Sequence, residues 1–268
     1  MKTFFNIKKT ILEVILIALS YYLLLNITLF LLFNYLNFEF ISSNINVEII
    51  NTTVISLLGL IIFFSFRKRF SAMQIKKTPT IKSITIIILL ILLCRIITDP
   101  IYRLDLIFGK GNTPVFFDYG KLETSILILF FLKTIIITPI VEELTFRKLI
   151  LNKLFDHKLP VFTSLIISSL LFSLIHINPL TLHTNTLFIT FITGMLFGFI
   201  YYKYGFLYSI ITHSGYNLLW LIVMINGEKY FYFLNKLNFG TVYWSIVILA
   251  LVLILFIIKQ ITLIVLKK

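Results

Sequence analysis

The chain of 268 residues is 59% hydrophobic and 13% charged, with a mean hydropathy of +1.01. It contains several apolar runs of about 18 residues or more, which are typical of helices that cross a hydrocarbon core of about 30 Å. Its net charge of +13 could indicate nucleic-acid binding, but the positions of the basic residues follow membrane topology instead. We therefore exclude a soluble enzyme and a nucleic-acid partner, and predict an all-α, polytopic membrane protein in the lipid bilayer.

Apolar runs divide the chain into eight predicted spans. The first follows the sequence MKTFFNIKKT and is too long for the apolar region of a signal peptide, so we expect a retained helix. No tandem repeat or soluble domain interrupts the spans, which predicts a single transmembrane domain over residues 1–268. In chain order, the predicted spans are residues 11–36, 49–66, 81–98, 124–155, 161–177, 185–202, 206–225 and 242–258.

The basic residues are distributed unevenly between the loops. With a cytoplasmic amino terminus, that side receives Lys2, Lys8 and Lys9, the basic segment 67–82 and most of the remaining lysines. The opposite side receives few basic residues, and several of these lie near acidic ones. This asymmetry is the positive-inside pattern. We therefore expect both termini in the cytoplasm and a multi-pass protein of the cell membrane, with a bacterial plasma membrane favoured.

Residues 138–150, with the sequence TPIVEELTFRKLI, place charged side chains inside an apolar span, where a charge is costly. Glu143 and Arg147 are four residues apart and share a helical face, which predicts an ion pair. Glu142 is rotated by about 100° from Glu143 and is left to face another partner. Pro139 lacks a backbone donor, which predicts a kinked or loosened helix before the glutamates. A structural ion pair between helices is the alternative interpretation.

Other ionisable residues also fall within predicted spans. Arg95 lies one helical turn before Asp99, which predicts a local ion pair at the outer boundary. Glu13 is near enough to a helix end for its side chain to reach the headgroups. Lys133 has no partner nearby in the sequence.

Two later spans carry histidines in short motifs: FSLIH ends at His176, and HSGYN runs from His213 to Asn217. A lone histidine in an apolar helix is more often a hydrogen-bonded core residue, but two of them with a carboxylate pair favour a functional site. With a rise of about 1.5 Å per residue, Glu142 and His176 lie about 20 and 22 Å from the inner ends of their helices, and His213 about 11 Å. The site therefore assembles only if the fourth span is long and embeds the glutamates.

Taken in order on successive spans, EELTFR, FSLIH and HSGYN resemble the EExxxR, FxxxH and HxxxN motifs of the CAAX protease and bacteriocin-processing enzyme family, also called the Abi family. The resemblance covers about residues 124–225, which would form the catalytic core. It implies hydrolysis of peptide bonds inside the membrane, with Glu142 as the general base. The other residues that the resemblance assigns to the site are Glu143, Arg147, His176, His213 and Asn217.

The residue types agree with these roles. Apolar surroundings disfavour the charged form of a carboxylate, which makes Glu142 a stronger base for activating water. Asn217 and a histidine can donate hydrogen bonds to the oxyanion that develops on the scissile carbonyl. A catalytic zinc held by Glu142, His176 and His213 is one alternative. The other is a metal-free mechanism in which His176 orients the water, and we favour this second mechanism.

The expected substrate is a membrane-associated peptide or protein, and the sequence leaves the oligomeric state open. A non-catalytic bacteriocin-immunity or regulatory membrane protein is a rival hypothesis, although the complete set of site residues argues against it. A proton-coupled transporter is a third hypothesis. It is disfavoured because the first half of the chain has neither an inverted repeat nor a matching acidic residue.

Overall fold

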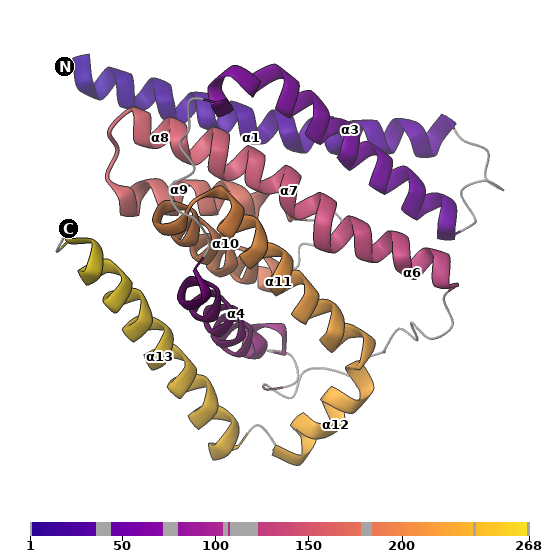
Figure 1. Cartoon of the computed structure of the whole chain (residues 1–268). Coiled ribbons are helices and arrows are strands. Elements are labelled where there is room, and N and C mark those ends of the chain that lie inside the picture. Colours follow the sequence, from indigo (N-terminus) through magenta and orange to yellow (C-terminus); the bar gives the residue numbers. More distant parts are fainter. Residues whose placement is uncertain are drawn as a thin grey trace. The chain divides into compact units, whose positions relative to one another are not determined.

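The structure, a computed structural model, is helical in the part of the chain that it describes (Figure 1). It describes residues 2–35, 44–71, 80–103, 107, 123–177, 184–237 and 240–266. An apolar helix of 14 residues, Val161–Leu174, accompanies seven helices that are long and apolar enough to cross a membrane. These seven segments are Ile7–Leu31, Asn46–Phe66, Ile81–Tyr102, Thr124–Asp156, Asn185–Tyr204, Phe206–Ile225 and Thr241–Thr262.

These helices confirm the predicted all-α, multi-pass membrane fold, and each of the eight predicted spans coincides with a helix. Large apolar side chains are exposed on several of them, including Phe30 at 68%, Phe64 at 60% and Leu255 at 59%. Such exposure suits helices that face lipid rather than water. The side of the membrane on which each loop lies stays a prediction, and residues 72–79 of the basic segment are outside the described part.

The chain groups into two compact units, which we describe separately: Met1–Thr78 with Gly120–Ser214, and Pro79–Tyr119 with Gly215–Lys268. The prediction of a single domain stays a prediction. The first unit contains α1 (Lys2–Tyr35), α3 (Asn44–Ser71), the run from α6 to α8, α9 (Val161–Leu174), α10 (Thr184–Tyr204) and the first half of α11 (Phe206–Ile225). The second unit contains α4 (Ile81–Tyr102), the rest of α11, α12 (Gly227–Leu237) and α13 (Thr241–Leu266).

The fourth predicted span is one continuous helical run in which two π-helical segments alternate with α-helix. Its segments are α6 (Thr124–Phe131), η2 (Leu132–Ile137), α7 (Thr138–Glu143), η3 (Leu144–Leu151) and α8 (Asn152–Asp156), where η2 and η3 are π-helical. Pro139 is the second residue of α7, just after η2, and the N–H of Thr138 donates to the carbonyl of Lys133. The loosening expected at Pro139 thus takes the form of a π-helical turn, a feature common near functional sites.

Helices α9 and α10 pack closely because small residues face each other. A Cβ at Gly194 would lie 3.1 Å from the Phe172 ring, and a Cβ at Gly198 would lie 2.9 Å from Cδ2 of Leu165. Ser168 and three other serines of α9 are fully buried. Close approach through small residues is a common way for membrane helices to associate. The packing brings Phe172 and Ser168 to the fourth span, where they contact the motif residues.

Charged residues elsewhere in the first unit find partners on other helices. Lys133 pairs with Glu48 of α3. Glu13 of α1 pairs with Lys153 of α8, although the sequence analysis expected it to reach the headgroups. Both pairings join residues far apart in the chain, so no local sequence pattern predicts them.

In the second unit, α4 packs along α13 (Figure 1). Helix α4 continues past the predicted end at residue 98, through Pro100 to Tyr102, and the Arg103 N–H then donates to the Pro100 carbonyl. Helix α12 was not predicted. Close packing of α11 on α4 is visible at Gly215, where a Cβ would lie 2.8 Å from Cδ1 of Ile91.

Candidate active site

Glu143 lies at the end of α7 and is completely buried. Its Oε2 accepts a hydrogen bond from Arg147 Nε at 3.2 Å and another from the Ser209 hydroxyl. Its Oε1 lies 3.1 Å from Nδ1 of His213. The predicted ion pair between Glu143 and Arg147 is confirmed. This carboxylate also holds two residues of α11.

Arg147 is fully buried and connects the fourth span to α9. Its Nη1 donates to the Ser168 hydroxyl at 3.1 Å, and Ser168 in turn donates to the carbonyl of Phe146 at 3.0 Å. The guanidinium also lies 5.2 Å from the centre of the Phe172 ring, over its face. A planar cation with several directed donors is suited to such a position. Arg147 therefore fixes the position of Glu143 and of the helix that carries His176.

Glu142 faces the two histidines rather than the arginine. Its Oε1 lies 3.7 Å from Nε2 of His176, and its Oε2 lies 3.6 Å from Nε2 of His213. The Glu142 side chain is 7% exposed, and its Oε2 has no hydrogen-bond partner among the described residues. The structure thus brings together the glutamate and the two histidines that the motifs singled out.

Both histidine rings are oriented by acceptors at Nδ1. His176 Nδ1 lies 2.7 Å from the carbonyl of Phe172, and His213 Nδ1 lies 3.1 Å from Glu143. Because a carbonyl and a carboxylate only accept, each Nδ1 carries a proton, and in the neutral ring Nε2 presents a lone pair. Two lone pairs and a carboxylate then surround one position. A water molecule there could donate to two of these acceptors and expose its own oxygen for attack.

Aromatic rings enclose this position. The Phe197 ring of α10 stacks on His213 with 4.4 Å between centroids, and the Phe172 ring contacts His213 edge-on at 5.8 Å. Phe172 also lies 4.7 Å from His176. The packing fixes the histidine rings and keeps bulk water away from one side.

Helix α1 contributes a residue that the motifs do not mark. Tyr21 is 4% exposed, packs edge-on against Phe146 at 5.9 Å, and lies close enough to Glu142 for an electrostatic interaction. Sequence reasoning also missed Ser209 and Phe197. Ser209 had a weak signal, because it lies one helical turn before His213 on the same helix.

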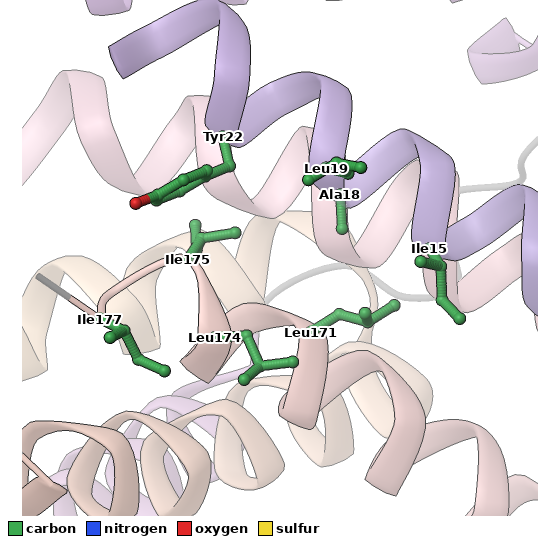
Figure 2. A pocket seen from close by; sticks show the side chains of 8 residues that line it. All are labelled: Ile15, Ala18, Leu19, Tyr22, Leu171, Leu174, Ile175 and Ile177. Carbon is green, nitrogen blue, oxygen red and sulfur yellow. The ribbon is translucent and has the colours of Figure 1, made fainter. Parts of the chain in front are cut away.

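An apolar pocket of about 340 Å³ is lined by Ile175 and Ile177, the two sequence neighbours of His176. In Figure 2 the end of α9 and the residues after it face α1 across the pocket, with Ile175 and Ile177 on one side and Ala18 and Tyr22 on the other. His176 lies between these two isoleucines in the sequence, and its side chain is 29% exposed. The site is therefore accessible at His176, next to an apolar surface.

Two predictions for the site have no structural outcome. Asn217 lies on α11 one turn after His213, but it belongs to the second unit, so its role stays a prediction. No group of three or more His, Cys, Asp or Glu side chains in the described ranges is arranged to hold a metal ion, including Glu142, His176 and His213. We therefore derive no step through a metal.

A comparison with protein-family models gave a match over residues 124–219, to the family described as type II CAAX prenyl endopeptidase Rce1-like. This segment contains the three motifs and all six residues assigned to the site. Searches of curated proteins and of solved structures gave no match. The match supports a CAAX-type peptidase in general, with a peptide or protein substrate, in a multi-pass membrane protein. As the motifs predicted, residues 124–219 match the Rce1-like family of CAAX proteases.

Proposed function

We propose that the chain is an intramembrane endopeptidase in which Glu142 activates a water molecule to hydrolyse a peptide bond of a membrane-associated peptide or protein. One observation carries this proposal: Glu142 faces Nε2 of both His176 and His213, while the adjacent Glu143 forms the ion pair with Arg147. A buried carboxylate without a countercation beside it is available as a base. A purely structural carboxylate would instead be saturated with donors, as Glu143 is.

In the first step, a water held between Glu142 and His176 gives a proton to the Glu142 carboxylate. Its oxygen attacks the carbonyl carbon of the substrate, and the carbonyl oxygen becomes an oxyanion. His176 positions the water through Nε2, because Nδ1 is fixed on the Phe172 carbonyl. A base held in this geometry contributes roughly 10²–10⁴-fold to the rate.

In the second step, the protonated Glu142 passes its proton to the leaving amine as the C–N bond breaks. The products are a carboxylic acid and an amine, so the water is consumed and the glutamate is restored. His213, whose ring Glu143 fixes through Nδ1 at 3.1 Å, presents Nε2 to the same position and orients the reacting groups there. Asn217, which the family resemblance assigns to the site, donates to the oxyanion.

The surroundings of the site support an apolar substrate segment. The pocket beside His176 is lined by aliphatic residues and one tyrosine. Its rim residues Ile15, Leu19 and Leu174 are 42–50% exposed, so the pocket opens toward the lipid rather than into the core. An apolar side chain next to the scissile bond can enter it from the membrane.

The test compares cells that produce the native chain, a Glu142→Gln variant or a Glu13→Gln variant. Secreted and membrane-associated peptides from each are identified by mass spectrometry. We expect a set of cleavage products that disappears in Glu142→Gln and persists in Glu13→Gln, which removes a carboxylate paired with Lys153 at another place in the same unit. Identical peptide patterns in the native chain and Glu142→Gln, with both proteins folded, would refute the proposal and favour a non-catalytic role.

A further inference from the structure

A second cluster of charged residues lies in the second unit, at the carboxyl end of α4. Asp99 is 3% exposed and lies between two arginines: Arg95 Nη2 is 3.5 Å from Oδ1, and Arg103 Nε is 3.6 Å from Oδ2. The arginine side chains are 11% and 14% exposed. The ion pair expected between Arg95 and Asp99 is thus confirmed, and a second arginine joins it.

Two tyrosines complete the coordination of Asp99. The Tyr230 hydroxyl of α12 donates to Oδ1 at 2.9 Å, and the Tyr243 hydroxyl of α13 donates to Oδ2 at 3.1 Å. Burial, together with the negative charge of Asp99, raises the pKa of Tyr230 to about 12, so this hydroxyl stays protonated and donates at neutral pH. The carboxylate therefore has four neighbouring donor groups and joins α4, α12 and α13.

Among the described residues, two guanidinium groups face the single carboxylate of Asp99, which leaves the cluster with one positive charge and several unused donors. In the described part of the chain, Arg95 Nε, Arg95 Nη1 and Arg103 Nε are buried and have no hydrogen-bond partner. The guanidinium faces lie over tyrosine rings, Arg95 at 4.9 Å from Tyr102 and Arg103 at 5.0 Å from Tyr230, which leaves the in-plane N–H groups for another acceptor. Buried donors without acceptors are rare in native proteins.

We propose that Arg95 and Arg103 bind the phosphate of a phospholipid headgroup. A phosphodiester carries one negative charge, which balances the cluster, and its oxygens suit the planar fork of arginine. The helix ends here have the composition of a membrane interface: Tyr232 and Phe233 on the amphipathic α12 are 64% and 54% exposed. Basic pockets between membrane helices are suited to lipid headgroups. The proposal uses none of the residues that we assign to the peptidase chemistry.

The experiment uses the full chain, purified in a non-ionic detergent and freed of lipid. Dihexanoyl phosphatidylglycerol is added at increasing concentration, and the melting temperature is followed by circular dichroism while bound lipid is counted by native mass spectrometry. Dihexanoylglycerol tests the acyl chains without phosphate, inorganic phosphate tests the free ion, and a short peptide with a free carboxyl terminus tests a peptide carboxylate. A ligand that binds only the folded state raises the melting temperature in a concentration-dependent way.

The main variant is Arg95→Gln, and the matched control is Lys259→Gln, which removes a charge from α13 about 24 Å along the helix from Tyr243. For the native chain and Lys259→Gln, we expect one bound phospholipid and a rise in melting temperature. For Arg95→Gln, we expect the affinity for the phospholipid to fall at least tenfold. If Arg95→Gln does not fold, Arg103→Gln and Arg95→Lys are measured instead, and each is expected to weaken binding.

Three results would overturn the proposal. Equal phospholipid binding by the native chain and the arginine variants would place the lipid elsewhere. An equal effect of dihexanoylglycerol would show that the acyl chains suffice. Inorganic phosphate or the peptide carboxylate binding as tightly as the phospholipid would assign the cluster to a different anion.

Discussion

The same substitution is expected to change the free energy of unfolding by different amounts at the two adjacent glutamates. Glu143→Gln removes a carboxylate that accepts from Arg147, Ser209 and His213. Glu142→Gln changes a side chain whose Oε2 has no hydrogen-bond partner among the described residues. Because glutamine has nearly the same shape as glutamate, the comparison tests the charge and leaves the packing intact.

The size of the effect follows from the burial of Arg147. This side chain is completely buried, and Glu143 is the carboxylate that pairs with it. Removing one partner of a buried ion pair costs about 3–5 kcal/mol of the free energy of unfolding. Ser168 and the Phe172 ring still contact the guanidinium, so we expect the lower end, about 3 kcal/mol. For Glu142→Gln we expect a loss below about 1 kcal/mol, or a gain, because a buried charge is replaced by a neutral amide.

The assay is unfolding of the full-length protein in detergent micelles, followed by circular dichroism. The double variant Glu143→Gln with Arg147→Gln completes a cycle, and we expect it to lose less free energy of unfolding than the two single variants together, since no lone charge stays buried. Equal losses for Glu142→Gln and Glu143→Gln would refute the assignment of different roles to the two residues. Additive losses in the cycle would refute the ion pair as the cause.

Three further outcomes are expected. Ala18→Phe places a ring in the pocket beside His176 and should lower kcat/KM about tenfold, mainly through KM, while Leu57→Phe in the separate groove between α1 and α3 should not; equal effects on peptide cleavage would contradict a substrate role for the pocket. Gly59→Ala brings a Cβ to 2.5 Å from Cγ2 of Val141 and should reduce the free energy of unfolding by about 1–3 kcal/mol. Adding Val141→Ala should restore part of that loss, and no recovery would place the strain elsewhere. Cleavage should persist after treatment with a chelator, and metal analysis of the purified protein should detect no stoichiometric zinc. Cleavage that depends on stoichiometric zinc would contradict the metal-free mechanism.

The sequence predicted the features that depend on short distances along the chain. The spans follow from apolar runs, and the pairs of Glu143 with Arg147 and of Arg95 with Asp99 follow from a spacing of four residues on a helix. The loosened helix at Pro139 follows from its missing donor. Each of these features depends only on residues close together in the sequence and on the geometry that all helices have in common.

The features that it did not predict depend on packing between distant segments. Lys133 and Glu48 are 85 positions apart, and Ser209 reaches Glu143 across 66 positions. Tyr21 lies on a helix without any motif, and it reaches the site only because α1 packs on the fourth span. Such contacts depend on how the helices pack in three dimensions. The hydropathy of a span does not predict which of its faces will contact a given neighbouring helix.

The arrangement shows how the base that we propose, Glu142, can be kept inside the membrane. A single buried glutamate would need a countercharge, and a direct arginine partner would make it a poor base. Here Arg147 pairs with Glu143, and the ring of His213 contacts both Glu143 and Glu142. Adjacent positions on a helix point about 100° apart, so one carboxylate can face the arginine while the next faces the two histidines. The π-helical turns on both sides of α7 place this change of direction in a loosened part of the helix. With only one glutamate, the carboxylate could either neutralise Arg147 or act as a base, but it could not do both. Two adjacent glutamates allow the two roles to be divided between them.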